Sequence, residues 1–372
     1  MKHFKRYLYK QVESDLAGKM VFIGGPRQVG KTTLALQFTK NESGYFNWDI
    51  AEHREHILKR ELSDTSIWIF DEVHKYRSWR NYLKGLYDKN RSLRKILVTG
   101  SARLDYYRRG GDSLQGRYHY LRLHPLSVAE LGIESQKDFM ELLLLGGFPE
   151  PFFSSAVVEA KRWLREYRER LMQDDLSSLE LVHDVGNVEL LMLRLPELVG
   201  SPLSINALRE DLQVSFRAAA NWLNILERLY AIFRISPFGS AKIRAVKKEQ
   251  KHYHFDWSLV NDNGARFENL VACHLLKWAH FQQDAFGENI ELRYFRDVDG
   301  REVDFVIMKN GKPMQAVECK YDDAPLHRGL IYYKERFPEC SCWQISAAGT
   351  KDYVSETNIR VCPAVKFLKD FI

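Results

Sequence analysis

The stretch from Gly25 to Thr33 has the residue types and the spacing of a phosphate-binding loop. It reads Gly-Pro-Arg-Gln-Val-Gly-Lys-Thr-Thr, with apolar residues 20–23 before it and helix-forming residues 33–38 after it. This order of strand, glycine loop and helix lets backbone N–H groups converge on a phosphate, while Lys31 reaches the β- and γ-phosphates. The hydroxyl of Thr32 is expected to ligate Mg²⁺. The predicted ATP contacts are Gly25, Pro26, Arg27, Gln28, Val29, Gly30, Lys31, Thr32 and Thr33.

Two adjacent carboxylates, Asp71 and Glu72, end a second apolar stretch, residues 66–70. Two acids at the end of a buried strand are costly unless a cation or a substrate uses them. We therefore predict that Asp71 holds the Mg²⁺ shell and that Glu72 polarises the attacking water.

Two further residues are weaker candidates for the same reaction. Ser101 follows a third apolar strand, residues 94–100, and is expected to sense the γ-phosphate, although a capped loop explains it equally well. Arg117 follows Gly116 at the entrance of another strand, and an arginine there can act as a finger on a neighbouring subunit. An ordinary surface arginine is the open alternative.

A different set of charges interrupts apolar strands near the C-terminal end of the sequence. Asp304 lies in the stretch 302–308, and Glu318 and Lys320 lie in the stretch 314–320, with Asn310-Gly311 between the two. Two carboxylates and a lysine at this spacing are typical of PD-(D/E)XK nucleases, in which Mg²⁺ or Mn²⁺ polarises the scissile phosphate and the lysine orients or activates water. Glu268, from a preceding amphipathic helix, is predicted to complete the metal shell. A buried ion-pair cluster in a nuclease-like fold without activity remains the alternative.

The register of this predicted hairpin decides whether the charges share a face. A two-residue turn at Asn310-Gly311 would pair Asp304 with Val317 and place Glu318 on the opposite face. We therefore predict a three-residue turn, residues 309–311, which pairs Asp304 with Ala316.

The middle of the chain predicts a helix–turn–helix. Residues 204–212 and 215–229 read as two helices, and the second has polar residues on one face and apolar residues on the other. Stretches 231–235 and 252–255 are candidate wing strands. Between the wing strands come the basic residues Lys242, Arg244, Lys247, Lys248 and Lys251. DNA in the major groove with a basic wing on phosphate is one interpretation, and a structural lid module is the other.

Length and composition fit a folded chain of two or three domains. The chain has 372 residues, of which 45% are hydrophobic and 28% charged, and its net charge of +6 is compatible with nucleic acid. The five cysteines have no framework spacing, which favours a reducing cytosol and hence a cytoplasmic protein. We recognise no signal peptide and no apolar run long enough for a membrane span.

Several motifs together resemble a large family of prokaryotic AAA-type ATPases with a PD-(D/E)XK nuclease-like C-terminal domain of unknown function. These motifs are residues 25–33, Ile-Phe-Asp-Glu-Val-His-Lys (69–75), Val-Thr-Gly-Ser-Ala-Arg (98–103), Leu-His-Pro-Leu-Ser (123–127), Gly-Gly-Phe-Pro-Glu-Pro (146–151) and Phe-Asp-Trp-Ser-Leu (255–259). The resemblance implies ATP hydrolysis at Lys31, Thr32, Asp71 and Glu72, with Ser101 as sensor.

The expected architecture is α/β and has three parts. Residues 1–131 are predicted to form a P-loop AAA-type ATPase core, residues 132–245 a helical lid and winged-helix domain, and residues 246–372 an α/β PD-(D/E)XK nuclease-like domain. The expected cofactors are ATP and Mg²⁺, with Mn²⁺ as an alternative at the C-terminal site. DNA is the expected partner, a homo-oligomer is open, and no membrane is expected.

Overall fold

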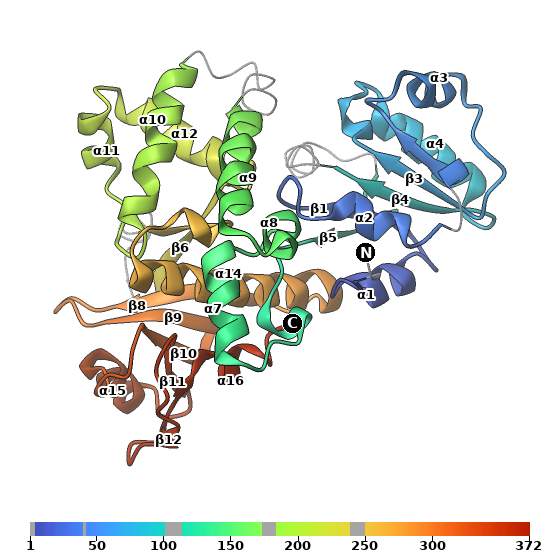
Figure 1. Cartoon of the computed structure of the whole chain (residues 1–372). Coiled ribbons are helices and arrows are strands. Elements are labelled where there is room, and N and C mark those ends of the chain that lie inside the picture. The colour runs from blue at the N-terminus through green and yellow to red at the C-terminus, as the bar shows by residue number, and fades with distance from the viewer. Residues whose placement is uncertain (1–3, 40–41, 101–113, 173–183, 239–249) are drawn as a thin grey trace. The chain divides into compact units, whose positions relative to one another are not determined.

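Two compact units make up the chain in the computed structural model, which describes residues 4–39, 42–100, 114–172, 184–238 and 250–372 (Figure 1). The first unit comprises Met1–His124 with the short segment Asp284–Phe286, and the second comprises Pro125–Gln283 and Gly287–Ile372. Among the described residues, no helix is both long and apolar enough to cross a membrane.

The first unit is built on a parallel five-stranded sheet with the strand order β2-β3-β4-β1-β5. Its strands are β1 (Met20–Gly24), β2 (Tyr45–Asn47), β3 (Ile67–Asp71), β4 (Lys95–Thr99) and β5 (Tyr118–Arg122). Every residue of β1 and β3 is buried, as expected for parallel strands that are covered on both faces. This mixed α/β arrangement with a parallel sheet confirms the predicted P-loop type of core.

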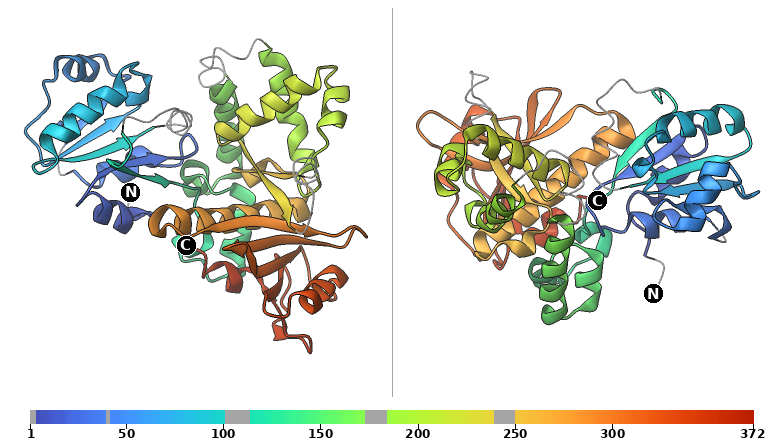
Figure 2. Two further views of the ribbon diagram at one scale, coloured as in Figure 1. Left: turned by 180° about the vertical axis from the view of Figure 1, so that it is seen from behind. Right: turned by 90° about the horizontal axis from the view of Figure 1, so that it is seen from above.

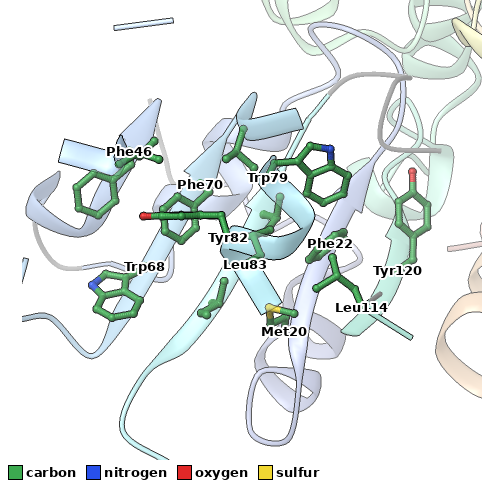
Figure 3. Packing of buried hydrophobic residues seen from close by; sticks show 14 residues of the cluster. Met20, Phe22, Phe46, Trp68, Phe70, Trp79, Tyr82, Leu83, Leu114 and Tyr120 are labelled. Atoms are coloured by element: carbon green, nitrogen blue, oxygen red, sulfur yellow. The ribbon is translucent and has the colours of Figure 1, made fainter. Parts of the chain in front are cut away.

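Aromatic packing holds one face of this sheet (Figure 3). Helix α4 (Trp79–Asn90) contributes Trp79, Tyr82 and Leu83, which join a cluster with Phe22 of β1 and Phe70 of β3. The rings of Phe70 and Tyr82 meet edge to face, with centroids 6.0 Å apart. The described residues of the unit also form α1 (Tyr9–Asp15), α2 (Lys31–Leu36), α3 (Ala51–Lys59), and the short 3₁₀ turns η1 (Glu42–Gly44) and η2 (Val73–Lys75).

The second unit begins with a run of helices. These are α6 (Val128–Leu131), α7 (Gln136–Leu145), α8 (Pro149–Ser154), α9 (Val157–Arg170), α10 (Val185–Arg194), η4 (Leu195–Leu198), α11 (Ile205–Asp211) and α12 (Phe216–Arg228). The turn between α11 and α12 ends at Ser215, whose hydroxyl accepts a hydrogen bond from the Ala218 N–H at 3.1 Å, as its position before the helix predicts. The predicted apolar face of α12 is buried, and its polar residues Arg217, Asn221, Asn224 and Arg228 are exposed.

A mixed eight-stranded sheet completes the second unit, with the order β12-β13-β11-β10-β9-β8-β6-β7. Its strands are β6 (Ile232–Phe238), β7 (Lys251–His254), β8 (Ile290–Arg296), β9 (Glu302–Lys309), β10 (Lys312–Lys320), β11 (Ser341–Ser346), β12 (Tyr353–Val354) and β13 (Ile359–Pro363). The other elements are η5 (Trp257–Leu259), α14 (Asn263–Phe286), α15 (Arg328–Arg336) and α16 (Ala364–Leu368). Helices α14 and α15 lie on opposite sides of the sheet (Figure 2).

The strands that follow the helix–turn–helix belong to this same sheet. Strand β6 pairs with β7 on one side and with β8 on the other, so both strands belong to the eight-stranded sheet. The proposed domain limit at residues 245 and 246 falls between two strands that are paired with each other. This pairing determines where Lys251, the first residue of β7, lies.

Candidate functional site

The glycine loop connects β1 to α2 and takes backbone conformations that other residues rarely adopt. Gly25 has φ 138° and Gly30 has φ 97°, and Gln28 between them has φ 58°. A Cβ atom on Gly25 would also lie 2.2 Å from the carbonyl oxygen of Leu123. Both the dihedral angle and the close approach therefore require glycine at position 25.

Lys31 and Arg6 both donate hydrogen bonds to backbone carbonyls of the loop. The Lys31 ammonium donates to the carbonyl oxygens of Gly25 at 3.1 Å and Pro26 at 2.6 Å, and the side chain is buried. The guanidinium of Arg6 donates to the carbonyl of Val29 at 2.5 Å and to that of His124. Arg6 was not predicted, because it lies far from the loop in sequence. Of the other loop residues, Pro26 and Val29 are buried, Arg27 and Gln28 are partly exposed, and Thr33 is exposed.

Asp71 is held by three hydroxyl groups at the carboxyl end of the sheet. Its Oδ2 accepts from Thr32 Oγ1 at 2.7 Å and from the Tyr45 hydroxyl at 2.9 Å, and its Oδ1 accepts from Thr99 Oγ1 at 2.7 Å. All three donors are neutral, so they orient the carboxylate without neutralising its negative charge. Oxygen donors from Thr32 and Asp71 side by side suit Mg²⁺, which prefers hard oxygen ligands.

Tyr45 and Thr99 were not predicted as site residues. They come from β2 and β4, which flank β3, and the register places Thr99 directly beside Asp71. For Thr99, the signal that could have found it is a polar residue at the carboxyl end of a neighbouring parallel strand, whereas Tyr45 begins β2 and has no such signal.

Glu72 follows Asp71 in a left-handed conformation, with φ 54°. Its backbone N–H donates to the Thr99 carbonyl at 3.0 Å, and its carboxylate lies 3.5 Å from His74 Nε2 and 3.7 Å from Lys75 Nζ. Burial, and then the neighbouring charge of Asp71, raise the pKa of Glu72. A raised carboxyl pKa favours proton uptake nearer to neutral pH, which is what a group that activates water requires. Positive φ at a non-glycine residue is the kind of backbone strain that concentrates at functional sites.

Ser101 lies outside the described residues. Arg117 lies at the amino end of the sheet, where its carbonyl accepts from the Met20 N–H at 3.0 Å, whereas the glycine loop follows the carboxyl end of β1. Its guanidinium pairs with Asp88 through two hydrogen bonds of 2.8 and 3.1 Å. Arg117 is therefore not brought to the loop of its own chain, and its action on a second subunit stays a prediction.

The hairpin of β9 and β10 differs from the predicted one in its turn. Lys309 pairs with Lys312 across a two-residue turn, in which Asn310 and Gly311 have φ 53° and 76°. The prediction of a three-residue turn was wrong, because Asn-Gly readily supplies the two positive φ angles of the shorter turn. A bulge between Pro313 and Gln315 then shifts the register, so that Val317 pairs with Phe305.

The bulge brings Asp304 and Glu318 opposite each other, since they are the next residues along the two paired strands. Their side chains therefore share a face, as expected, although by a different route. Asp304 Oδ2 also accepts from the Cys319 N–H at 2.9 Å. Cys319 and the other four cysteines are free thiols.

A lysine that we had grouped with the basic wing lies in the middle of these acids. The Lys251 side chain is only 1% exposed, and its Nζ lies 2.5 Å from Glu302 Oε1, 3.5 Å from Glu268 Oε1 and 3.8 Å from Asp304 Oδ1. The assignment of Lys251 to a DNA-contacting wing was therefore wrong, because β7 is an inner part of the fold. The wing residues Lys242, Arg244, Lys247 and Lys248 lie outside the described residues.

The remaining acid of the predicted metal set has its own partners. Glu318 Oε1 lies 2.7 Å from Lys320 Nζ and 3.1 Å from His327 Nδ1. Burial alone would raise the pKa of Glu318, but the hydrogen bond from His327 and the charge of Lys320 lower it. Burial, then Glu318 and Glu268, raise the pKa of Asp304 well above its usual value.

These acids do not fit the divalent metal that the nuclease pattern implies. The carboxylates of Glu268, Glu302 and Asp304 face the Lys251 ammonium. Glu318 faces Lys320 and His327. Across the described ranges, no group of three or more His, Cys, Asp or Glu residues has an arrangement that could hold a metal ion.

Three family models match successive parts of the chain. Residues 17–132 match a model described as an AAA domain. Residues 136–266 and 263–367 match two domains of unknown function, DUF8612 and DUF4143.

Curated relatives and solved structures were also found. The uncharacterized proteins Rv2008c of Mycobacterium tuberculosis and Mb2031c of Mycobacterium bovis are each 25% identical over 354 residues, which cover 86% of this chain and 78% of theirs. A RuvB variant from Thermotoga maritima is 16% identical, with 61% of this chain and 88% of that chain covered and a TM-score of 0.30. A STAND signal transduction ATPase with a tetratricopeptide repeat sensor from Pyrococcus horikoshii is 15% identical, with 77% and 48% covered and a TM-score of 0.25.

TM-scores of this size are too low to establish a shared fold. The conclusion rests instead on the AAA domain match and on the loop, the parallel sheet and the Asp71-Glu72 strand end that lie within it. Residues 17–132 match an AAA domain and contain the glycine loop, parallel sheet and acidic strand end that are typical of a P-loop ATPase core.

Proposed function

We propose that the chain is a Mg²⁺-dependent ATPase whose hydrolysis drives a conformational change on DNA. The observation that carries the first part is the contact between Thr32 and Asp71 beside the glycine loop, with an Oγ1–Oδ2 distance of 2.7 Å. This contact joins the loop that would bind phosphate to the strand end that would bind its metal.

Each residue has a defined task in this proposal. The backbone N–H groups of residues 25–33 bind the phosphates, and Lys31 exchanges its carbonyl partners for phosphate oxygens. Thr32 and Asp71 hold Mg²⁺, which neutralises charge on the phosphates. Glu72 orients the attacking water and accepts its proton on a carboxylate oxygen.

The proposal of DNA as the partner is supported by α12. Its exposed face presents two arginines and two asparagines, a set that can contact phosphates and base edges. Two of these side chains, Arg217 and Asn221, are a turn apart near the start of the helix, which is the end that enters the major groove in helix–turn–helix proteins.

The test is ATP hydrolysis measured with and without duplex DNA, in the wild-type protein and in an Arg217→Ala/Asn221→Ala variant. We expect DNA to stimulate hydrolysis in the wild type and to lose that effect in the variant, while hydrolysis without DNA is kept. The matched control is Arg162→Ala, which removes another exposed helical arginine, on α9. Equal hydrolysis with and without DNA would remove DNA from the proposal and leave the ATPase.

A second candidate function is a nucleotide-gated switch whose nuclease-like domain is inactive and binds a partner protein. The observation that favours it over DNA cleavage by Glu268, Asp304, Glu318 and Lys320 is the ammonium of Lys251 among these acids. Absence of cleavage with Mg²⁺ and with Mn²⁺, together with hydrolysis that DNA does not change, would select this candidate.

A further inference from the structure

The acid cluster of the second unit consists of Glu268, Glu302, Asp304 and Glu318, and it contains its own positive charge. Lys251 Nζ lies within 3.8 Å of a carboxylate oxygen of each of the first three. The Tyr294 ring lies against the same ammonium, with its centroid 5.3 Å away. The fourth acid is paired with Lys320 and His327.

The backbone around Lys251 fixes it in this place. As the first residue of β7, Lys251 pairs with Ile235 of β6, and it also forms a bridge with Pro202. The preceding carbonyl, of Gln250, accepts from the Leu203 N–H at 2.8 Å. Backbone pairing on both sides prevents the lysine from leaving the cluster by a simple movement of β7.

Tyr253, two residues after Lys251 on β7, contacts Glu268 from the same face of the strand. Its hydroxyl donates to Glu268 Oε1 at 2.7 Å, and this oxygen also faces Lys251. Glu302 has a further cationic neighbour, Arg296, at 3.6 Å. Among the described residues, the ionisable groups that contact the four carboxylates thus include Lys251, Lys320, Arg296 and His327.

The acid cluster offers a divalent cation no position like the one that the Lys251 ammonium occupies. Mg²⁺ requires oxygen ligands at about 2.0–2.1 Å in a near-octahedral arrangement. Glu268, Glu302 and Asp304 each turn a carboxylate oxygen to the ammonium of Lys251, and a metal held by these oxygens would meet a like charge at short range.

We propose that Lys251 is the resident cation of this cluster and takes the place of a divalent metal. The cluster then works as a permanent ionic anchor between β7, α14 and the β9–β10 hairpin, and the C-terminal domain does not cleave nucleic acid through a metal bound there. This inference goes beyond the proposed ATPase, because it concerns only the second unit.

The experiment measures metal binding directly, with Tb³⁺ luminescence and with Mn²⁺ titration calorimetry. All samples carry Asp71→Asn, so that the nucleotide site contributes no signal and the result is independent of ATP hydrolysis. Tyr253 and Tyr294 lie beside the cluster and would sensitise a bound Tb³⁺ ion. With Lys251 present we expect no saturable binding up to the highest metal concentration used. In Lys251→Met we expect saturable binding with a Kd at least tenfold below that concentration, and we expect Asp304→Asn added to this variant to abolish it.

Two controls make the outcome decisive. Lys320→Met removes a lysine that also contacts a carboxylate but is 30% exposed, and it is expected to create no such site. If Lys251→Met fails to fold, the double variant Lys251→Met/Glu302→Gln is used in its place, because it keeps the net charge of the cluster. Saturable binding of Mn²⁺ or Tb³⁺ to the protein with Lys251 present, lost on Asp304→Asn, would overturn the proposal, and so would equal binding with and without Lys251 in folded variants.

Discussion

Both units enclose carboxylates, and they surround them with opposite kinds of neighbour. In the first unit, Asp71 is surrounded by the hydroxyls of Thr32, Tyr45 and Thr99. In the second unit, Asp304 and Glu268 face the ammonium of Lys251. In our proposal, Asp71 offers its charge to a metal that arrives with the nucleotide, whereas the acids of the second unit share one resident ammonium.

The difference shows how neighbours determine what a buried acid can do. A neutral hydroxyl fixes the direction of a carboxylate and contributes about 1 kcal/mol of net hydrogen-bond free energy, whereas a unit charge about 4 Å away contributes about 4 kcal/mol at an effective dielectric constant of about 20. A site that must bind and release a metal with each nucleotide needs the first kind of neighbour. A site that serves as a permanent connection between elements can use the second.

The largest expected effect is the loss of nucleotide binding in Lys31→Ala. Its ammonium is the only side-chain charge that we assign to the β- and γ-phosphates, so its removal should lower ATP affinity below detection in a fluorescent-nucleotide titration. The matched variant Lys95→Ala removes an exposed lysine in the same unit and should bind ATP like the wild type. Nearly normal affinity in Lys31→Ala would contradict the assignment of the loop.

Glu72→Gln should separate binding from chemistry in the first unit. The amide keeps the size of the side chain but cannot accept the proton of the attacking water, so we expect hydrolysis to fall by about 10²–10⁴-fold while ATP stays bound. Retention of radiolabelled ATP after gel filtration, compared with single-turnover hydrolysis, measures both. Hydrolysis at the wild-type rate would show that another group activates the water.

Tyr45→Phe tests whether the neutral donors around Asp71 matter. Loss of one hydrogen bond to a metal-binding carboxylate should raise the Mg²⁺ concentration needed for half-maximal hydrolysis by about tenfold, with little change in ATP affinity. Tyr87→Phe is the control, because its hydroxyl donates to the Gly18 carbonyl at the other end of the sheet. An unchanged Mg²⁺ dependence would reduce Tyr45 to a packing role.

The smallest expected effect is a change in the pH dependence of unfolding in Asp304→Asn. The pKa of Asp304 is raised above its usual 3.8 by burial and by Glu318 and Glu268, so the folded chain holds a proton that the unfolded chain has released. Over this window the free energy of unfolding falls as the pH rises. The asparagine variant should lose that part of the slope in urea unfolding, which begins as the pH rises above the usual carboxyl value of about 4.

Asp352→Asn is the control, because its effect on the pH dependence of unfolding should have the opposite sign. The hydrogen bond from Lys366, and then the charge of Arg360, lower the pKa of Asp352, so its contribution is present above the usual 3.8 and lost as the pH falls below it. Identical slopes in the wild type and in Asp304→Asn would show that Asp304 does not hold the extra proton.

The sequence predicted the first unit well because its signals are local. The loop, the apolar strands around it and the Asp71-Glu72 strand end can each be recognised within a dozen consecutive residues. The burial of the apolar residues confirms the strands. Tyr45 and Thr99 escaped prediction because their role depends on which strands are neighbours. The strand order of a parallel sheet is set by packing over long sequence separations.

Prediction of the second unit failed where strand pairing between distant parts of the chain determines the position of a residue. Lys251 follows several other basic residues and therefore read as part of a solvated charge run, but the pairing of β6 with β8 draws β7 into the fold. Alternation with Tyr253 is the sequence signal that both side chains leave β7 on one face. The turn of the β9–β10 hairpin was predicted one residue too long, because a bulge that restores the register has no clear sequence signature.

The extra residue in β10, Met314, makes this hairpin sensitive to how it forms from the unfolded chain. The Asn310-Gly311 turn alone would start a pairing in which Asp304 meets Val317, and the chain must accommodate Met314 as a bulge to escape it. A growing hairpin that slips past the bulge would direct Glu318 and Lys320 away from the cluster, so this error has to be undone before the unit can fold. Deletion of Met314 should remove that competing pairing, leave Asp304 opposite Glu318, and allow faster refolding of the second unit.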